Sequence, residues 1–103
     1  MPNKNYISGR NFESRFIANL LEKGNAVKGG RFHASKGITD VWWVDKKGTH
    51  HEAQLKFSSI RRPVIGDLEL NELIKFAHEM TDYMKIWLVK KQARKPVEME
   101  LLS

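Results

Sequence analysis

Residues 38–57 of the chain read ITDVWWVDKKGTHHEAQLKF, and this stretch decides the fold. Residues 38–44 are rich in β-branched and aromatic side chains, which are enriched in strands. Residues 49–57 end in an alternation of apolar and polar side chains, which is the period of a half-buried strand. Residues 45–48 (DKKG) have the composition of a tight turn. The stretch therefore predicts a β-hairpin.

The residues before the hairpin predict a helix followed by a short strand. Ser8 is a suitable N-cap, and apolar side chains follow it at helical spacing until Gly24, which favours helix termination. Residues 26–33 are compatible with a short extended segment, although Gly29 and Gly30 weaken this pattern.

The residues after the hairpin predict a second helix and two further strands. Asp67 is a suitable N-cap for a helix with an apolar stripe at Leu70, Leu73, Ile74 and Ala77. Residues 83–89 form an apolar strand, and an alternating strand follows Pro96. The predicted order is α-β-β-β-α-β-β, which indicates a small α/β domain whose central mixed sheet is flanked by helices.

Length and composition limit the classes of protein that this chain can represent. Its 103 residues allow one domain and exclude a two-domain cofactor enzyme. No cysteine is present, so the chain has neither disulfides nor thiolate metal ligands, and an intracellular, cytoplasmic location is expected. We expect no membrane span and no signal peptide, because apolar runs are short and the N-terminus lacks an apolar region.

The positive charge is concentrated in the first two-thirds of the chain. The net charge is +6, of which residues 1–66 carry +7 and residues 67–103 carry −1. A basic surface of this kind favours a polyanionic partner, most often nucleic acid. The alternative at this point is a basic protein with no such partner.

Two carboxylates occupy unusual positions in the pattern. Glu13 has apolar residues three, four and seven positions later in its helix, so it lies on or beside the face that packs. Asp40 begins an apolar strand, where aspartate is disfavoured. Either residue can bind a cation. The alternatives are a boundary side chain that reaches solvent for Glu13 and a local backbone contact for Asp40.

The second strand of the hairpin places three polar side chains on one face. Strand alternation puts Glu52, Gln54 and Lys56 together, opposite the face of Ala53 and its apolar neighbours. Next to a strand that bears Asp40, these groups can form a site for a hard cation, which prefers oxygen ligands. The alternative is an ordinary strand with one solvated face.

The chain has a glutamate on its first helix, then an aspartate at a strand start, and then a strand with a lysine two residues after Gln54. This order of residues resembles the PD-(D/E)xK nuclease superfamily. Within it, the chain is most similar to the archaeal-type Holliday junction resolvases. The similarity extends over nearly the whole chain. The matching segments are residues 9–13 (GRNFE), 20–24 (LLEKG), 35–41 (SKGITDV), 64–67 (VIGD) and 73–76 (LIKF).

This resemblance implies a restriction-endonuclease-like fold over residues 1–103 and a role in DNA recombination and repair. The implied activity is magnesium-dependent cleavage of four-way DNA junctions, with Mn²⁺ as a possible substitute. Glu13, Asp40, Gln54 and Lys56 would be the catalytic residues, and the first three would hold the metal. Because two opposing strands are cut, the resemblance also implies a homodimer, with an interface that can include the second helix and Phe76 or Met80.

Gln54 departs from the pattern of the resembled family, which has glutamate two residues before the lysine. A glutamine oxygen can bind magnesium but contributes no charge. Three interpretations remain: an active Gln-x-Lys variant, a site rewired through Glu52, or a relative that only binds nucleic acid. The first is favoured because Glu13, Asp40 and Lys56 are all present.

Candidate contacts to DNA phosphates are spread over the basic part of the chain. Ser35 belongs to a loop that contacts DNA in the resembled family, and Arg61-Arg62 beside a proline is the pair we favour first. The other candidates are Arg10, Arg15, Arg31 and Lys36. For each charged residue the alternative is a solvated surface charge. Alternative functions are cleavage of other DNA structures, binding without catalysis, and association with RNA.

Overall fold

The predicted order of elements is confirmed in the computed structural model. The backbone is described for residues 4–32 and 38–103, and side chains are described from Arg10 onward within these ranges. The elements are α1 (Lys4–Glu22), β1 (Lys28–Arg31), β2 (Val41–Val44), β3 (His50–Ser58), α2 (Asp67–Glu79), β4 (Lys85–Gln92) and β5 (Glu98–Leu101).

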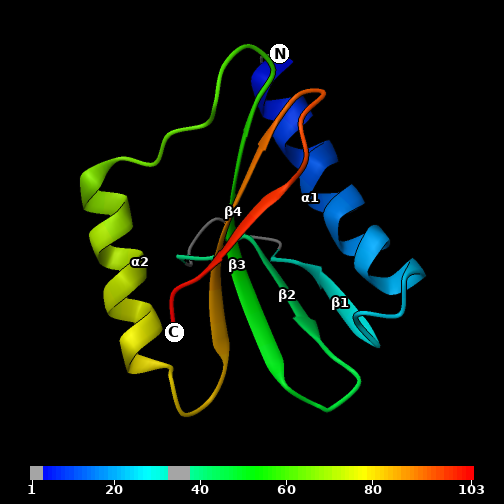
Figure 1. Cartoon of the computed structure of the whole chain (residues 1–103), viewed down its shortest axis with the longest axis vertical. Helices are drawn as coiled ribbons and strands as arrows, with labels where there is room; N and C mark the ends of the chain where they lie inside the picture. Colours follow the sequence, from blue (N-terminus) through cyan, green and yellow to red (C-terminus); the bar gives the residue numbers. More distant parts are fainter. Residues whose placement is uncertain (1–3, 33–37) are drawn as a thin grey trace.

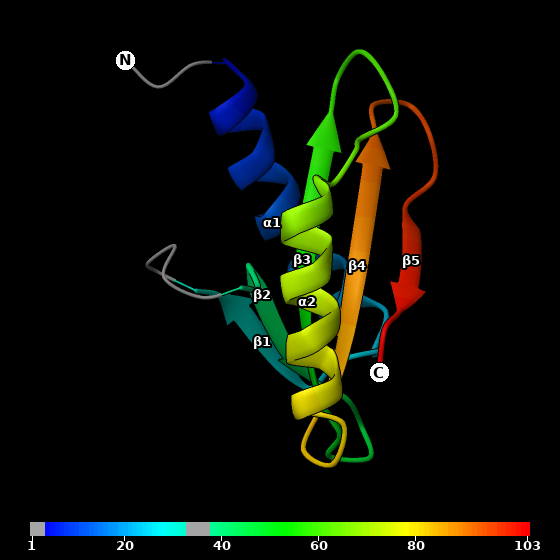
Figure 2. The same cartoon turned by 90° about the vertical axis from the view of Figure 1, so that its left-hand side faces the viewer.

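The five strands form a mixed sheet in the order β1-β2-β3-β4-β5. Neighbouring strands are antiparallel except for β3 and β4, which are parallel and connected through α2. Helices α1 and α2 cover opposite faces of the sheet (Figures 1 and 2). The small α/β domain with a mixed sheet is thus the predicted one.

The central hairpin forms as predicted, but β2 begins at Val41 rather than at residue 38. The Leu55 N–H donates to the Asp40 carboxylate instead of to a backbone carbonyl of β2, so the backbone pairing between β2 and β3 ends at this point. In the turn, the Asp45 carboxylate accepts hydrogen bonds from two backbone N–H groups, and Gly48 adopts a φ of 84°. Aspartate and glycine provide these two features at low cost.

Both predicted helix starts are displaced. Helix α1 begins at Lys4, before the predicted cap Ser8, because residues 4–7 contain no glycine or proline that would break the helix. Gly66, not Asp67, is the N-cap of α2, and its cap makes no side-chain hydrogen bond. Asp67 is instead the first helical residue, where its negative charge interacts favourably with the positive end of the helix dipole. The predicted end of α1 near Gly24, which has a φ of 74°, is confirmed.

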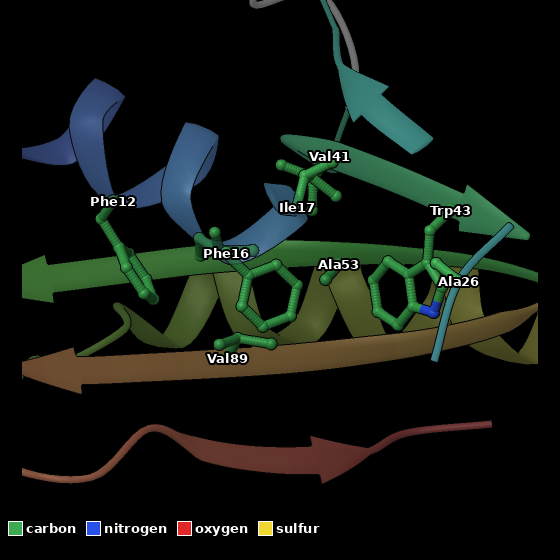
Figure 3. Packing of buried hydrophobic residues seen from close by; sticks show 9 residues of the cluster. Phe12, Phe16, Ile17, Ala26, Val41, Trp43, Ala53 and Val89 are labelled. Carbon is green, nitrogen blue, oxygen red and sulfur yellow. The ribbon is translucent and has the colours of Figure 1, made fainter. Parts of the chain in front are cut away.

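Two apolar cores lie on the two faces of the sheet. On the α1 face, Phe12, Phe16 and Ile17 pack against Val41, Trp43, Ala53 and Val89 (Figure 3). On the α2 face, Leu73 and Ala77 pack against Ile86 and Leu88, with Phe76 and Met80 partly buried beside them. Strand β3 contributes Ala53 and Leu55 to the α1 face, so its intervening polar residues lie on the α2 face.

Gly29 permits a close approach of β1 to β2. A Cβ atom on Gly29 would lie 2.9 Å from the Trp42 carbonyl oxygen and 3.0 Å from the Trp43 Cβ. One of the two glycines that weaken the strand pattern is therefore the residue that lets β1 approach its partner Trp43 closely. Within the described part of the chain, no helix is long and apolar enough to cross a membrane.

Candidate active site

Asp40 is held rigidly where β2 meets β3. Its backbone N–H donates to the Ala53 carbonyl (2.9 Å), and its Oδ2 accepts the Leu55 N–H (2.8 Å). These two bonds lie on either side of Gln54 in β3. Burial raises the pKa of Asp40, while the Leu55 hydrogen bond and the Lys56 charge act in the opposite direction. Asp40 is therefore a fixed, half-buried carboxylate whose ionised form gains from a nearby cation.

Gln54 and Lys56 share one contact, which is Glu69 in the first turn of α2. The Lys56 Nζ lies 2.6 Å from Glu69 Oε2. The Gln54 Nε2 donates to the same oxygen at 3.4 Å. The Lys56 charge lowers the pKa of Asp40, and the Glu69 charge raises it. Asp40, Lys56 and Glu69 therefore interact electrostatically, and Gln54 joins them through its hydrogen bond to Glu69.

Glu13 approaches this cluster from α1. Burial is the main cause that raises its pKa, followed by the Asp40 charge, and Arg31 and Arg10 lower it. Glu13 Oε2 lies 3.7 Å from Arg31 Nε, which is an ion pair but too long for a hydrogen bond. Among the described residues, neither of these two buried atoms has a hydrogen-bond partner.

Glu52 lies on the predicted face but has a different partner. Its Oε1 accepts the hydroxyl hydrogen bond of the buried Thr39. The carboxylate that contacts Gln54 and Lys56 is that of Glu69, a residue that sequence reasoning did not select. Its only signal in the sequence is its place in the first turn of a helix that follows the strand of Lys56.

The other predicted residues lie around this cluster or outside it. Arg31 lines a pocket of about 660 Å³ between α1 and β1 together with Phe32 and Trp42. Arg10 and Arg15 are exposed on α1. Arg61 and Arg62 are exposed in the loop between β3 and α2, and Arg62 forms an exposed ion pair with Glu98 (3.3 Å). Ser35 and Lys36 lie outside the described residues.

The side chains gathered here can bind a hard cation only if the Gln54 amide oxygen is one of the ligands. Within residues 4–32 and 38–103, no group of three His, Cys, Asp or Glu side chains is arranged to hold a metal ion. Asp40, Glu13 and the Gln54 oxygen are nevertheless all hard oxygen donors. A divalent cation would relieve the mutual repulsion of Asp40 and Glu13, and it would provide a ligand contact for the Glu13 oxygen that accepts no hydrogen bond from the described residues.

The fold of this chain, a five-stranded mixed sheet between two helices, is shared with a solved structure. The solved structure of Hjc, a Holliday junction resolvase from the archaeal hyperthermophile Archaeoglobus fulgidus, has this fold with a TM-score of 0.69. The match covers 92% of this chain and 73% of that chain at 16% sequence identity. No protein-family model and no curated protein sequence matches the chain. At this identity, the likeness establishes the shared fold.

Proposed function

We propose that this chain is a metal-dependent endonuclease domain that resolves four-way DNA junctions. The observation that carries the proposal is the meeting of Asp40, Gln54 and Lys56 at the junction of β2 and β3, with Glu13 adjacent. The resolvase fold supports the choice of nuclease chemistry. The basic surface, with a net charge of +6, supports a nucleic-acid substrate.

In the proposed mechanism, Asp40, Glu13 and Gln54 would hold Mg²⁺, and Mn²⁺ can substitute. When bound, this ion lowers the pKa of a water ligand and stabilises the negative charge of the phosphate in the transition state. The Lys56 ammonium contributes a second positive charge for the phosphate and a donor that orients the attacking water. Arg31, beside Glu13, provides a guanidinium that can bind a neighbouring phosphate bidentately.

Cleavage of two opposing strands requires two active sites, so the proposal includes a homodimer with a twofold axis. Phe76 and Met80 are partly buried against the chain's own α2-face core, which leaves them less surface for an interface. Sedimentation velocity of the protein alone and with a junction measures the number of copies directly.

The proposed function is tested with a panel of DNA and RNA substrates in Mg²⁺, Mn²⁺ and EDTA. We expect paired cuts in a four-way junction, dependent on the metal and stronger than on nicked, flapped or linear duplexes. Preferential cleavage of another substrate would reassign the nuclease to that substrate. Tight junction binding without scission in either metal would contradict catalysis and favour a binding-only relative.

The loop that carries Arg61 and Arg62 is expected to contribute to junction binding through phosphates. Replacing both arginines with alanine should weaken binding and reduce the slope of log K against log salt by about 2, since each phosphate contact contributes roughly one unit. The matched control is Lys46→Ala with Lys47→Ala, which removes the same charge at the hairpin turn, at the other end of the sheet (Figure 1). Equal slopes for the two double variants would remove this loop from the proposed interface.

A further inference from the structure

One carboxylate oxygen connects the two β3 residues of the candidate site. Glu69 Oε2 contacts Lys56 Nζ at 2.6 Å and Gln54 Nε2 at 3.4 Å. Glu69 lies in the first turn of α2, so its side chain enters the site from a different element than the other groups. The site thus contains a negative charge at the place where Gln54 itself has none.

The contact with Glu69 decides which end of the Gln54 amide is available. An ionised carboxylate only accepts hydrogen bonds, so the amide nitrogen, not the oxygen, must face Glu69. This orientation leaves Gln54 Oε1 free, and the amide oxygen is the atom that a hard cation prefers. A neutral side chain at position 69 would accept either end of the amide and remove this constraint.

The same contact restrains the Lys56 ammonium. Lysine is a point charge on a flexible stem, and the Lys56 charge is close enough to Asp40 to lower the pKa of that carboxyl group. Without the Glu69 charge, the ammonium would be drawn to Asp40, where it would compete with a cation. The 2.6 Å ion pair to Glu69 provides the opposing attraction.

We infer that Glu69 is a positioning residue that supplies, from α2, the negative charge that position 54 lacks. It fixes the Gln54 amide with the oxygen free, and it holds Lys56 beside the site rather than on Asp40. This inference rests on the proposed nuclease function for its catalytic consequence. The pairing of positions 54 and 69 rests on the contacts alone.

The pairing is tested first in the metal-free protein by thermal unfolding of four proteins. They are the wild type, Gln54→Glu, Glu69→Gln and the double variant that exchanges the two groups. Gln54→Glu should lower the Tm by about 3 °C, because it places two carboxylates against each other in a partly exposed pair. The exchange variant should recover most of that loss. Glu72→Gln, the same change at an exposed position of α2, is the matched control and should show no coupling with Gln54→Glu.

The catalytic role is tested by steady-state cleavage of the junction with the same proteins. Glu69→Gln should lower kcat about tenfold with little change in KM, the size of effect typical of residues that orient a ligand. Gln54→Glu alone should give no gain, and the exchange variant should recover activity. Glu72→Gln should cleave as the wild type does.

The two readouts separate failure of the inference from failure of the proposed function. If the wild type cleaves but Glu69→Gln has unchanged kcat and KM, the positioning role is overturned. If Gln54→Glu is both as stable as the wild type and more active, the charge is not already supplied by Glu69 and the inference is overturned. If no protein cleaves any substrate, the nuclease proposal fails, while the coupling in the melting cycle still decides the pairing.

Discussion

Asp40→Asn is expected to abolish metal-dependent cleavage and, at the same time, to raise the thermal stability of the metal-free protein. The asparagine side chain retains an oxygen that can accept the Leu55 N–H, so the 2.8 Å bond that anchors the residue can persist. The variant loses the charged ligand, and the cleavage rate should fall by at least about 10²–10³-fold. It also loses a carboxylate whose ionised form burial disfavours, so the Tm should rise by a few degrees.

The stability difference between Asp40→Asn and the wild type should depend on pH in a defined direction. The pKa of Asp40 is raised in the folded state, so the folded protein binds this proton more tightly than the unfolded chain. That contribution to stability is complete below the unfolded pKa, about 3.9, and is lost as pH rises through the folded pKa. The Tm advantage of Asp40→Asn should therefore be largest at neutral pH and shrink toward pH 4.

Asp45 has the opposite behaviour but does not affect this comparison. The hydrogen bond from His51 is the main cause that lowers the pKa of Asp45. Its contribution to stability is therefore present above its unfolded pKa and lost as pH falls through the folded pKa. Both proteins contain Asp45, so its contribution cancels in the difference between their Tm values at each pH.

Metal addition provides a control that is independent of cleavage. Mg²⁺ or Mn²⁺ that binds the folded protein should raise the Tm of the wild type and have a much smaller effect on Asp40→Asn. Asp82→Asn, a substitution at an exposed position after α2, should respond to the metal as the wild type does. Equal metal-induced shifts in all three proteins, or wild-type cleavage by Asp40→Asn, would remove Asp40 from the proposed site.

The local pattern of the sequence was sufficient to predict the hairpin and the order of elements. The alternation in residues 49–57 is a property of the strand itself, so it placed Gln54 and Lys56 on one face without knowledge of the rest of the fold. The anomaly of aspartate before an apolar strand was also local. The structure shows its physical basis, because the Asp40 carboxylate replaces a backbone acceptor for Leu55.

The partners of these polar groups could not be predicted in the same way. Glu52 and Glu69 were equally available as carboxylates, and which one meets Gln54 depends on where α2 lies over β3. That position is set by the α2-face core of Leu73 and Ala77 on β4, which is a tertiary contact. Helix starts were displaced for a different reason: a residue suited to capping does not by itself end a helix, and residues 4–7 contain no glycine or proline that would stop α1 from beginning before Ser8.

Trp43→Ala is expected to cause the largest loss of stability of any substitution considered for this protein. Trp43 is 4% exposed and belongs to the α1-face core, where it lies beside Ala26 at one end of the cluster (Figure 3). Its ring meets Phe16 edge-on at 5.6 Å and stacks on His51 at 4.9 Å with an interplanar angle of 2°. Truncation of a buried tryptophan typically costs about 3–5 kcal/mol, against a total of about 5–15 kcal/mol for a domain.

The loss of stability should exceed the effect of the cavity alone, because Trp43 covers a row of hydrogen-bonded side chains that crosses the sheet. The Trp87 indole donates to His51 Nδ1 (3.0 Å), and His51 Nε2 lies 2.8 Å from Asp45 Oδ2. An indole N–H can only donate, so Nδ1 is the acceptor and Nε2 carries the hydrogen toward Asp45. Removing the stacked ring exposes this chain to water, which weakens each of its bonds.

Urea unfolding followed by circular dichroism measures the effect, with Trp42→Ala as the matched control. Trp42 is the adjacent residue of β2 and points to the other face, where it is only partly buried, so its truncation should cost clearly less. Trp43→Phe keeps an aromatic ring over His51 and should fall between the two, which preserves the comparison if Trp43→Ala does not fold. A larger loss for Trp42→Ala than for Trp43→Phe would place the main stabilising contact of β2 at Trp42 instead. That result would contradict the assignment of Trp43 as a main contributor to the core that holds α1, and with it Glu13, against the hairpin.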